Sequence, residues 1–221
     1  MEGINPVESK NVIKNFLKMG VSAIAYLRNL FAESIFEDAT IAGLPLKRLT
    51  RATPESSALI DWIDCGIYDA LGKEYLKALA ITIHDNKDVP LESYNFSFNY
   101  DVENTECGNS EDNNLIQVFV SEGTGANEKN SVGTLTVNKD QIKTQTIQVL
   151  RDLILLIQSL SPLPENRFIS MKLLYYDAKV PKGYEPPFFR QATATERAVQ
   201  DHSNIKQDIG MVRKHLSLSN I

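Results

Sequence analysis

The chain has 221 residues, of which 43% are hydrophobic and 23% charged, and its formal net charge is −5. These values are typical of a soluble globular protein that buries one core, so we expect a single domain. The acidic balance argues against direct nucleic-acid binding, which requires clustered Lys and Arg. The sequence contains no stretch of about 18 uncharged apolar residues and no basic start followed by an apolar block, so neither a membrane span nor a secretion signal is predicted.

Two helices are predicted in the first third of the chain. Apolar residues recur at steps of three and four between positions 11 and 31, which indicates one helical face. These residues are Val12, Phe16, Met19, Ala23, Leu27 and Leu30. Ser9 is the expected N-cap. After a connector with a short extended piece at 39–51, a second helix is predicted from Pro54, which suits a first turn, to about Tyr75.

Alternation with a period of two then replaces the helical spacing, which predicts strands. Leu79, Ile81 and Ile83 alternate, and the next strand places five apolar or aromatic residues on one face: Tyr94, Phe96, Phe98, Tyr100 and Val102. Two more strands, at 115–120 and 132–137, are expected around the polar loops 103–114 and 121–130.

A third helix is predicted at 144–160, apolar on most sides and therefore buried against a sheet. Its central stripe is Ile147, Leu150, Leu153, Ile154, Ile157 and Leu160. A strand follows at 168–176, in which Ile169, Met171, Leu173 and Tyr175 alternate. Helices combined with antiparallel-type strands predict an α+β fold.

Beyond Asp177 the regular patterns weaken. Residues 178–208 contain few apolar positions besides a proline-aromatic cluster, and strand-like pieces return only in D-I-G-M-V-R-K-H-L-S-L-S-N-I at the end. About 30 residues without a clear element are unusual inside a compact domain, and they indicate either a functional loop or a tail.

Motifs for catalysis or metal binding are weak. Gly123 and Gly125 in G-T-G lack a third glycine and a following helix, so we expect a hairpin loop there and no phosphate site. The three histidines have no metal-ligand spacing, the two cysteines are too far apart for a CxxC-type zinc site, and we predict free thiols and neither metal nor cofactor. Asp61 and Asp64 lie near one side of the second helix, where a solvated face is favoured over acid–base chemistry. No nucleophile elbow is present, so we expect no enzyme activity.

Three blocks of sequence carry a resemblance to a known family. They are L-I-D-W-I-D-C-G-I-Y-D-A-L-G-K-E-Y-L-K-A-L at 59–79, E-S-Y-N-F-S-F-N-Y at 92–100 and M-K-L-L-Y-Y-D-A-K-V-P-K-G-Y-E-P-P-F-F-R at 171–190. Together they resemble the HORMA domain, and more narrowly its meiotic chromosome-axis group. The resemblance covers nearly the whole chain.

The resemblance implies a HORMA fold: a mostly antiparallel sheet on three helices over residues 1–177, followed by a safety belt and C-terminal strands at 178–221. In this family the belt closes over a closure-motif peptide, which joins the sheet beside the strand that precedes the belt. The residues then expected to bind the peptide are Ile169, Met171, Leu173, Tyr175, Tyr184, Phe188 and Phe189. Those expected in the belt or the closing strands are Pro181, Pro186, Pro187, Ile209, Val212, Leu216 and Leu218.

The function implied by the resemblance is that of a peptide-binding, chromosome-associated nuclear protein that promotes recombination and homologue synapsis. Its guests would come from its own longer form or from other axis proteins, and an AAA+ ATPase is a possible remodeller. The alternatives are a spindle-checkpoint or polymerase-adaptor HORMA protein, or an unrelated α+β enzyme that uses Asp61, Asp64 or His84. We predict no direct contact of this domain with nucleic acid or membrane.

Overall fold

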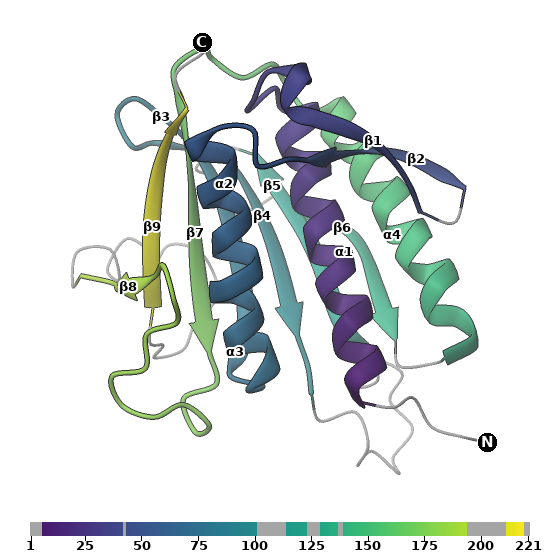
Figure 1. The fold of residues 1–221 in the computed structure, drawn as a ribbon, viewed down its shortest axis with the longest axis vertical. Coiled ribbons are helices and arrows are strands. Elements are labelled where there is room, and N and C mark those ends of the chain that lie inside the picture. The colour runs from purple at the N-terminus through teal and green to yellow at the C-terminus, as the bar shows by residue number, and fades with distance from the viewer. Residues whose placement is uncertain are drawn as a thin grey trace.

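The computed structural model describes residues 6–41, 43–100, 114–122, 129–136, 139–193 and 211–218. Three helical bodies cover one face of a large sheet, and a small hairpin lies across the helical layer (Figure 1). This arrangement confirms the predicted α+β fold. No helix within these ranges is long and apolar enough to cross a membrane.

The large sheet has seven strands, and all of its neighbouring pairs are antiparallel. In spatial order the strands are β6 (Lys129–Thr136), β5 (Asn114–Glu122), β4 (Pro90–Phe98), β3 (Leu76–Asp85), β7 (Arg167–Tyr175), β9 (Met211–Leu218) and β8 (Arg190–Gln191). The long central strand β3 is buried on both faces from Ala78 to His84. The alternation predicted for β4 is confirmed for Tyr94, Phe96 and Phe98, which are buried while the residues between them are half-exposed. Strand β4 ends before the predicted Tyr100, and Val102 lies outside the described residues.

Helix α1 (Pro6–Leu27) differs from the prediction at both ends. It begins before Ser9, which therefore lies inside the helix and is not its cap; Pro6 suits the first helical position. It ends four residues before Phe31 because Asn29 adopts a left-handed backbone with φ of 50°. The Leu30 amide then donates to the Ala25 carbonyl at 2.9 Å, which closes the helix end with a bond of the Schellman type.

The second helical body is continuous but irregular. It runs through α2 (Pro54–Asp61), a π-helical turn η2 (Trp62–Ile67) and α3 (Tyr68–Gly72). Its start matches the prediction: Thr53 accepts from the Ser56 amide at 3.2 Å in a capping box, and Pro54 occupies the first turn. Its end comes before the predicted Tyr75, because Glu74 turns left-handed with φ of 60°.

Two further elements complete the helical layer. Helix α4 (Lys139–Ser159) lies beside α1 and packs on β6, with Leu150, Leu153 and Ile157 fully buried as predicted. The predicted connector forms a hairpin of β1 (Phe36–Ile41) and β2 (Leu44–Leu49), and β2 packs on α1. A short 3-10 turn, η1 (Glu33–Ile35), precedes it.

A buried ion pair joins the end of α1 to the sheet. Arg28 Nε donates to Glu92 Oε2 at 3.0 Å, and Arg28 Nη2 also donates to the Ser161 carbonyl at 2.5 Å. The Tyr94 hydroxyl donates to the same carboxylate at 2.7 Å. Burial raises the pKa of the Glu92 carboxyl, against the opposing effects of Tyr94 and Arg28. The network therefore fixes α1, β4 and the loop after α4 relative to one another.

Replacing Arg28 by alanine leaves the Glu92 charge buried without its cation. We expect Arg28→Ala to lower the free energy of unfolding by about 3–5 kcal/mol, measured by urea denaturation. The matched control is Arg48→Ala, which removes the exposed Arg48–Glu37 pair and is expected to cost less than about 1 kcal/mol. Equal losses in the two variants would contradict the structural role of the buried pair.

Candidate strand-addition site

Strand β7 is the element beside which a guest strand was predicted. Of the residues expected to bind it, Ile169, Met171, Leu173 and Tyr175 are 0–3% exposed and belong to the core. Their side chains are therefore held in the helix-facing core. Strand β7 can therefore bind a neighbouring strand mainly through its backbone groups. On the opposite face of β7, the residues alternate between buried and half-exposed.

The outer edge of β7 is already paired with the chain's own C-terminal strand. Strand β9 pairs with β7 in an antiparallel register from Arg167↔Leu218 to Leu174↔Met211. Val212 lies opposite Leu173, and Leu216 lies opposite Ile169. The position predicted for a guest peptide is thus occupied by residues that were predicted to close the domain. Ile209, also expected in the closing strands, lies outside the described residues.

The polypeptide that leaves β7 packs against the helical layer through Tyr184. The Tyr184 hydroxyl donates to Asp69 Oδ2 at 2.6 Å, and its ring lies edge-on to Tyr75 and Tyr175 at centroid distances of 5.1 and 5.4 Å. Lys73 Nζ lies 4.9 Å from the Tyr184 ring centroid and also binds Asp69 at 2.7 Å. Tyr184 is therefore an anchor to α3 in this structure, and its predicted contact with a guest stays a prediction.

The two adjacent phenylalanines point to different surroundings. Phe189 is only 7% exposed, and its ring centroid lies 6.3 Å from that of Trp62. Phe188 is 45% exposed and has a left-handed backbone with φ of 68°, which is unusual for a bulky residue. Of the two, only Phe188 presents its side chain to solvent, and the role of both rings as a cover for the guest stays a prediction.

Gly66 makes the Phe189 contact possible. A Cβ atom at this position would lie 2.3 Å from Phe189 Cε2 and 2.7 Å from the Pro187 carbonyl oxygen. Gly66 belongs to the π-helical turn η2, a local irregularity that often marks functional sites. Sequence reasoning did not single out Gly66, although a glycine inside a predicted helix, where it costs stability, was an available signal.

The prolines shape this segment without joining the sheet. The Pro181 carbonyl accepts from the Tyr184 amide at 3.2 Å, and the Pro186 carbonyl accepts from the Phe189 amide at 3.1 Å. Two tight turns therefore orient the two anchoring rings. Pro186 is buried, whereas Pro181 and Pro187 are exposed. After Phe189 the chain forms β8, whose residues Arg190 and Gln191 pair with Arg213 and Val212 on the outer side of β9.

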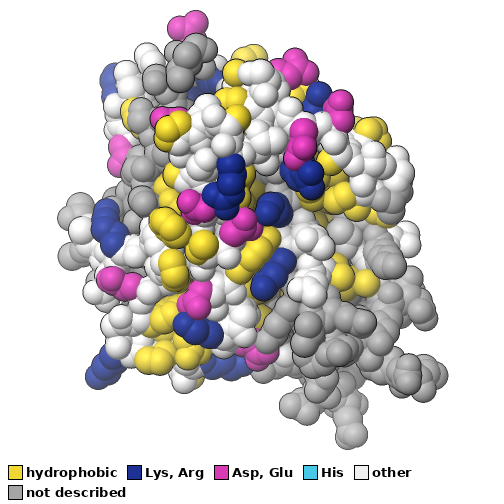
Figure 2. All heavy atoms as spheres, viewed as in Figure 1, with side chains coloured by type: hydrophobic (Ala, Val, Ile, Leu, Met, Phe, Trp, Pro, Cys, Tyr) yellow, Lys and Arg dark blue, Asp and Glu magenta, His cyan; other side chains and the backbone are white. Residues whose placement is uncertain are grey.

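The candidate catalytic residues do not form a shared site. Arg51 Nη1 binds Asp61 at 2.5 Å and its Nη2 binds Asp64 at 3.3 Å, while Lys18 binds Asp64 at 3.1 Å. Basic and acidic side chains are interspersed over the helical face in this way (Figure 2). His84 lies on β3, with Nε2 2.6 Å from the buried Ser170 hydroxyl. These contacts favour the solvated-face interpretation of Asp61 and Asp64. Within the described ranges, no group of three His, Cys, Asp or Glu residues is placed to hold a metal ion.

A family model for the HORMA domain matches residues 9–216, so the chain belongs to the HORMA domain family. It is 35% identical over 224 residues to meiosis-specific protein ASY1 of Arabidopsis thaliana, which covers 98% of this chain and 36% of that protein. It is 31% identical over 213 residues to HORMA domain-containing protein 2 of Bos taurus, covering 94% of this chain and 64% of that protein. The chain thus spans about a third of the first relative and less than two thirds of the second.

Solved structures confirm the fold. C. elegans HTP-2 bound to the HIM-3 closure motif aligns with a TM-score of 0.64 and 17% identity, covering 86% of this chain and 78% of that chain. C. elegans HTP-1 bound to HTP-3 motif-1 aligns with a TM-score of 0.61 and 18% identity over the same shares. At this level of identity the likeness establishes the HORMA fold of the chain.

Substituting Gly66 by alanine should dislodge Phe189 from the helical layer. We expect Gly66→Ala to lower the free energy of unfolding by about 1–3 kcal/mol and to speed amide exchange of residues 184–193. Gly72→Ala is the control, since a Cβ there meets no atom within 4 Å. Unchanged exchange in Gly66→Ala would contradict the close approach of Phe189 to η2.

The Tyr184 anchor should weaken in acid. Burial raises the pKa of the Asp69 carboxyl, but the hydrogen bonds from Lys73 and Tyr184 outweigh it, so the pKa lies below the ordinary value of 3.8. A depressed pKa stabilises the folded state above pH 3.8, and this contribution is lost as the pH falls through the folded-state pKa.

An NMR titration of the Tyr184 ring resonances should therefore show release of the anchor below about pH 4. In Asp69→Asn the same resonances should show no transition there. A transition of equal size in both proteins would assign the acid sensitivity to another group.

Proposed function

We propose that this chain is a non-catalytic peptide-binding module of the meiotic chromosome axis, which holds closure-motif peptides by strand addition to β7. The observation that carries the proposal is the pairing of β7 with β9, a strand from the far C-terminal end of the sequence. An edge that accepts one extended segment through backbone hydrogen bonds offers the same bonds to another, because those bonds tolerate many sequences.

In this proposal, the guest and β9 compete for the same backbone hydrogen-bond donors and acceptors on the outer edge of β7. Because β7 has β3 on its other side, only its outer edge is open to exchange. The structure then corresponds to a state in which the chain's own strand fills the site, and a guest gains the edge only by displacing β9. Residues 178–221 act in the proposal as the belt and closing strands of the same domain.

The similar proteins support a role for this chain in meiosis. ASY1, at 35% identity across nearly the whole chain, is named as meiosis-specific, and the fold neighbour HTP-2 is described as bound to the HIM-3 closure motif. We infer a nuclear, chromosome-associated role in assembling the axis and promoting recombination and synapsis. Guests would come from other axis proteins or from a longer form of this protein, and an AAA+ ATPase would exchange the strands. The spindle-checkpoint alternative has weaker support, because a chain of the mitotic checkpoint complex aligns with a TM-score of 0.52 and 10% identity, which is evidence for the fold alone.

A reversible lock between β7 and β9 tests the proposal. Phe168 and Ser217 are register partners, so Phe168→Cys with Ser217→Cys places two thiols across the pair. In a Cys65→Ser, Cys107→Ser background, oxidation should abolish binding of fluorescent peptides tiled across axis proteins, and reduction should restore it. Peptide binding is followed by fluorescence anisotropy.

The single-cysteine variants, treated with the same oxidant, control for oxidation damage. Full peptide binding by the oxidised, locked protein would place the peptide site away from β7 and contradict the proposal.

A further inference from the structure

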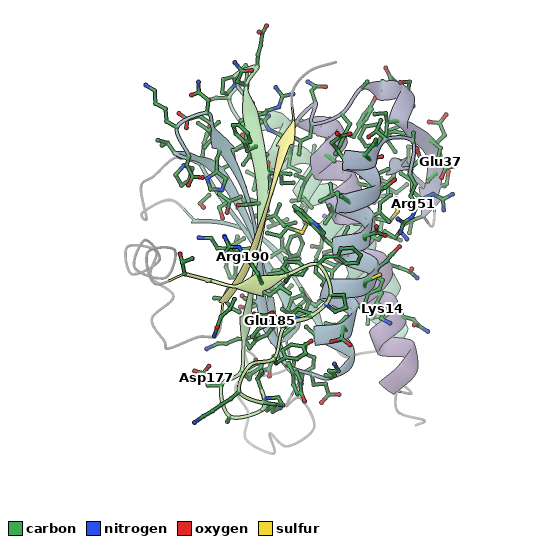
Figure 3. The ribbon with its side chains drawn as sticks, turned by 60° about the vertical axis from the view of Figure 1, so that its left-hand side comes forward. Lys14, Glu37, Arg51, Asp177, Glu185 and Arg190 are labelled. Atoms are coloured by element: carbon green, nitrogen blue, oxygen red, sulfur yellow. The ribbon has the colours of Figure 1, made fainter. Side chains whose placement is uncertain are left out.

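The hairpin of β1 and β2 forms a separate two-stranded sheet with edges of its own. It lies across the helical layer, and Glu37 of β1 and Arg190 of β8 lie on opposite sides of the molecule (Figure 3). The edge of a strand presents N–H and C=O groups that can pair with another chain, and proteins usually block such edges. The two edges of this hairpin differ in this respect.

The outer edge of β2 is blocked. The Leu49 amide points away from β1 and donates to Ser22 Oγ of α1 at 3.3 Å. Pro45 lies four residues earlier on the same strand, so its backbone nitrogen has the same orientation and carries no hydrogen to donate. Strand β2 also packs on α1. A further strand therefore cannot pair along β2.

The outer edge of β1 is not blocked in this way. Residues directly opposite each other in an antiparallel pair point either toward or away from one another. Phe36 is opposite Leu49, so its backbone groups point away from β2, and the same holds two and four residues later, at Asp38 and Thr40. The Phe36 amide donates to the Glu33 carbonyl. Within the described residues, the outward backbone groups of Asp38 and Thr40 have no hydrogen-bond partner.

The acidic side chains of β1 are matched across the hairpin. Glu37 binds its register partner Arg48 at 2.7 Å, and Asp38 binds its register partner Lys47 at 3.0 Å. Charged residues on an edge strand usually discourage pairing with another chain. Here two acidic residues face two basic ones, so an approaching strand meets no net charge from the hairpin.

The two edges of the large sheet have other protective features. Strand β6 has a bulge, because Ser131 and Gly133 are opposite consecutive residues of β5. Strand β8 has only two residues. Bulges and very short strands both prevent pairing at an edge. Among the strands that the structure describes, the six-residue strand β1 is thus the one whose edge has none of these protections.

A second copy of β1 fits this edge. Outward residues must be opposite outward residues, so two copies can pair in antiparallel orientation about Ala39. Asp38 is then opposite the second copy's Thr40, and Glu37 is opposite the second copy's Ile41. No like charges are directly opposite in this register. Asp38 and Thr40 are exposed, so the edge selects its partner by register and charge and does not enclose its side chains.

Other registers of the same pair are less favourable. Centring the pair on Glu37 or Asp38 places two identical acidic residues opposite each other, which destabilises antiparallel strands. Centring it on Thr40 leaves the outward groups of Asp38 opposite the turn, beyond the end of the strand at Ile41. The register about Ale39 is avoided by neither constraint, because it pairs both Asp38 and Thr40 within the strands.

We propose that this protein dimerises through its β1 edges, so that β1 and β2 of two copies form one continuous antiparallel sheet about Ala39. The inference goes beyond the proposed function and does not depend on peptide binding. A dimer of this kind leaves the β7 edge of each copy accessible, because β1 and β8 lie on opposite sides of the molecule (Figure 3). The contact is small, so dimers form at high local concentration.

Disulfide cross-linking tests the register. In a Cys65→Ser, Cys107→Ser background, Ala39→Cys places two thiols at a non-hydrogen-bonded pair, where Cα atoms are about 4.5 Å apart and a disulfide fits. Thr40→Cys is the matched control. It is more exposed than Ala39, so random collision favours it, but its two copies are diagonal neighbours about 7–8 Å apart.

Under mild oxidation, Ala39→Cys should form covalent dimers at least about ten-fold faster than Thr40→Cys, because pairing holds its thiols at a high effective concentration. Dimers are counted by non-reducing electrophoresis. Equal or faster cross-linking of Thr40→Cys would assign the dimers to collision or to another register and overturn the proposal.

Blocking the edge tests the dimer without cross-linking. Thr40→Pro removes an outward amide and keeps the bonds between β1 and β2, as Pro45 does on the other strand. Two-fold symmetry doubles the loss, so the dimer dissociation constant in sedimentation equilibrium should rise about ten-fold or more. Thr40→Ala, which keeps the amide, should change it little.

Urea denaturation of both variants verifies that the hairpin change leaves the fold intact, and the cross-linking comparison stands if Thr40→Pro does not fold. A chain that stays monomeric up to millimolar concentration would contradict the proposal. Protection of the β1 amides by a different axis protein, without self-association, would assign the edge to that partner and overturn the dimer.

Discussion

The arrangement of the chain after β7 depends on the outer edge of that strand, whose backbone groups need hydrogen-bond partners. Strand β7 is buried on its helix-facing side from Ile169 to Tyr175, so it cannot leave the core. Its inner edge is bonded to β3, and its outer edge presents backbone groups that require a partner or water. In this structure β9 supplies the partner. Under the proposed function, the occupant of that edge decides whether the domain can bind a guest.

The anchors of the preceding segment do not depend on that occupant. Tyr184 contacts Asp69 and Tyr75, and Phe189 contacts Trp62 beside Gly66, all of them on or next to the second helical body. None of these contacts involves β9. The chain can therefore remain attached as far as Phe189 while the strand beside β7 is exchanged, which separates a fixed part of the C-terminal segment from a part that changes partners.

Regular patterns in the sequence were sufficient to predict the core. The alternation of Tyr94, Phe96 and Phe98 and the helical stripe of α4 each reflect burial on one face, which is a local property of sequence. Helix ends were predicted less well, because Asn29 and Glu74 adopt left-handed conformations that no pattern required. Local patterns could not predict the occupant of the β7 edge, since β9 is remote from β7 in the sequence. The burial of Phe189 likewise depends on η2, where the buried Gly66 leaves room for its ring.

NMR can identify directly which strand lies beside β7 when a peptide is bound. Cross-strand NOEs between β7 and β9, centred on Met171 and Lys172, should be visible in the free chain. At saturation with a bound axis peptide, NOEs from the same β7 protons to the peptide should replace them. If the β7–β9 NOEs persist at full strength while the peptide is bound, the peptide and β9 do not share the edge, and strand addition at β7 is ruled out.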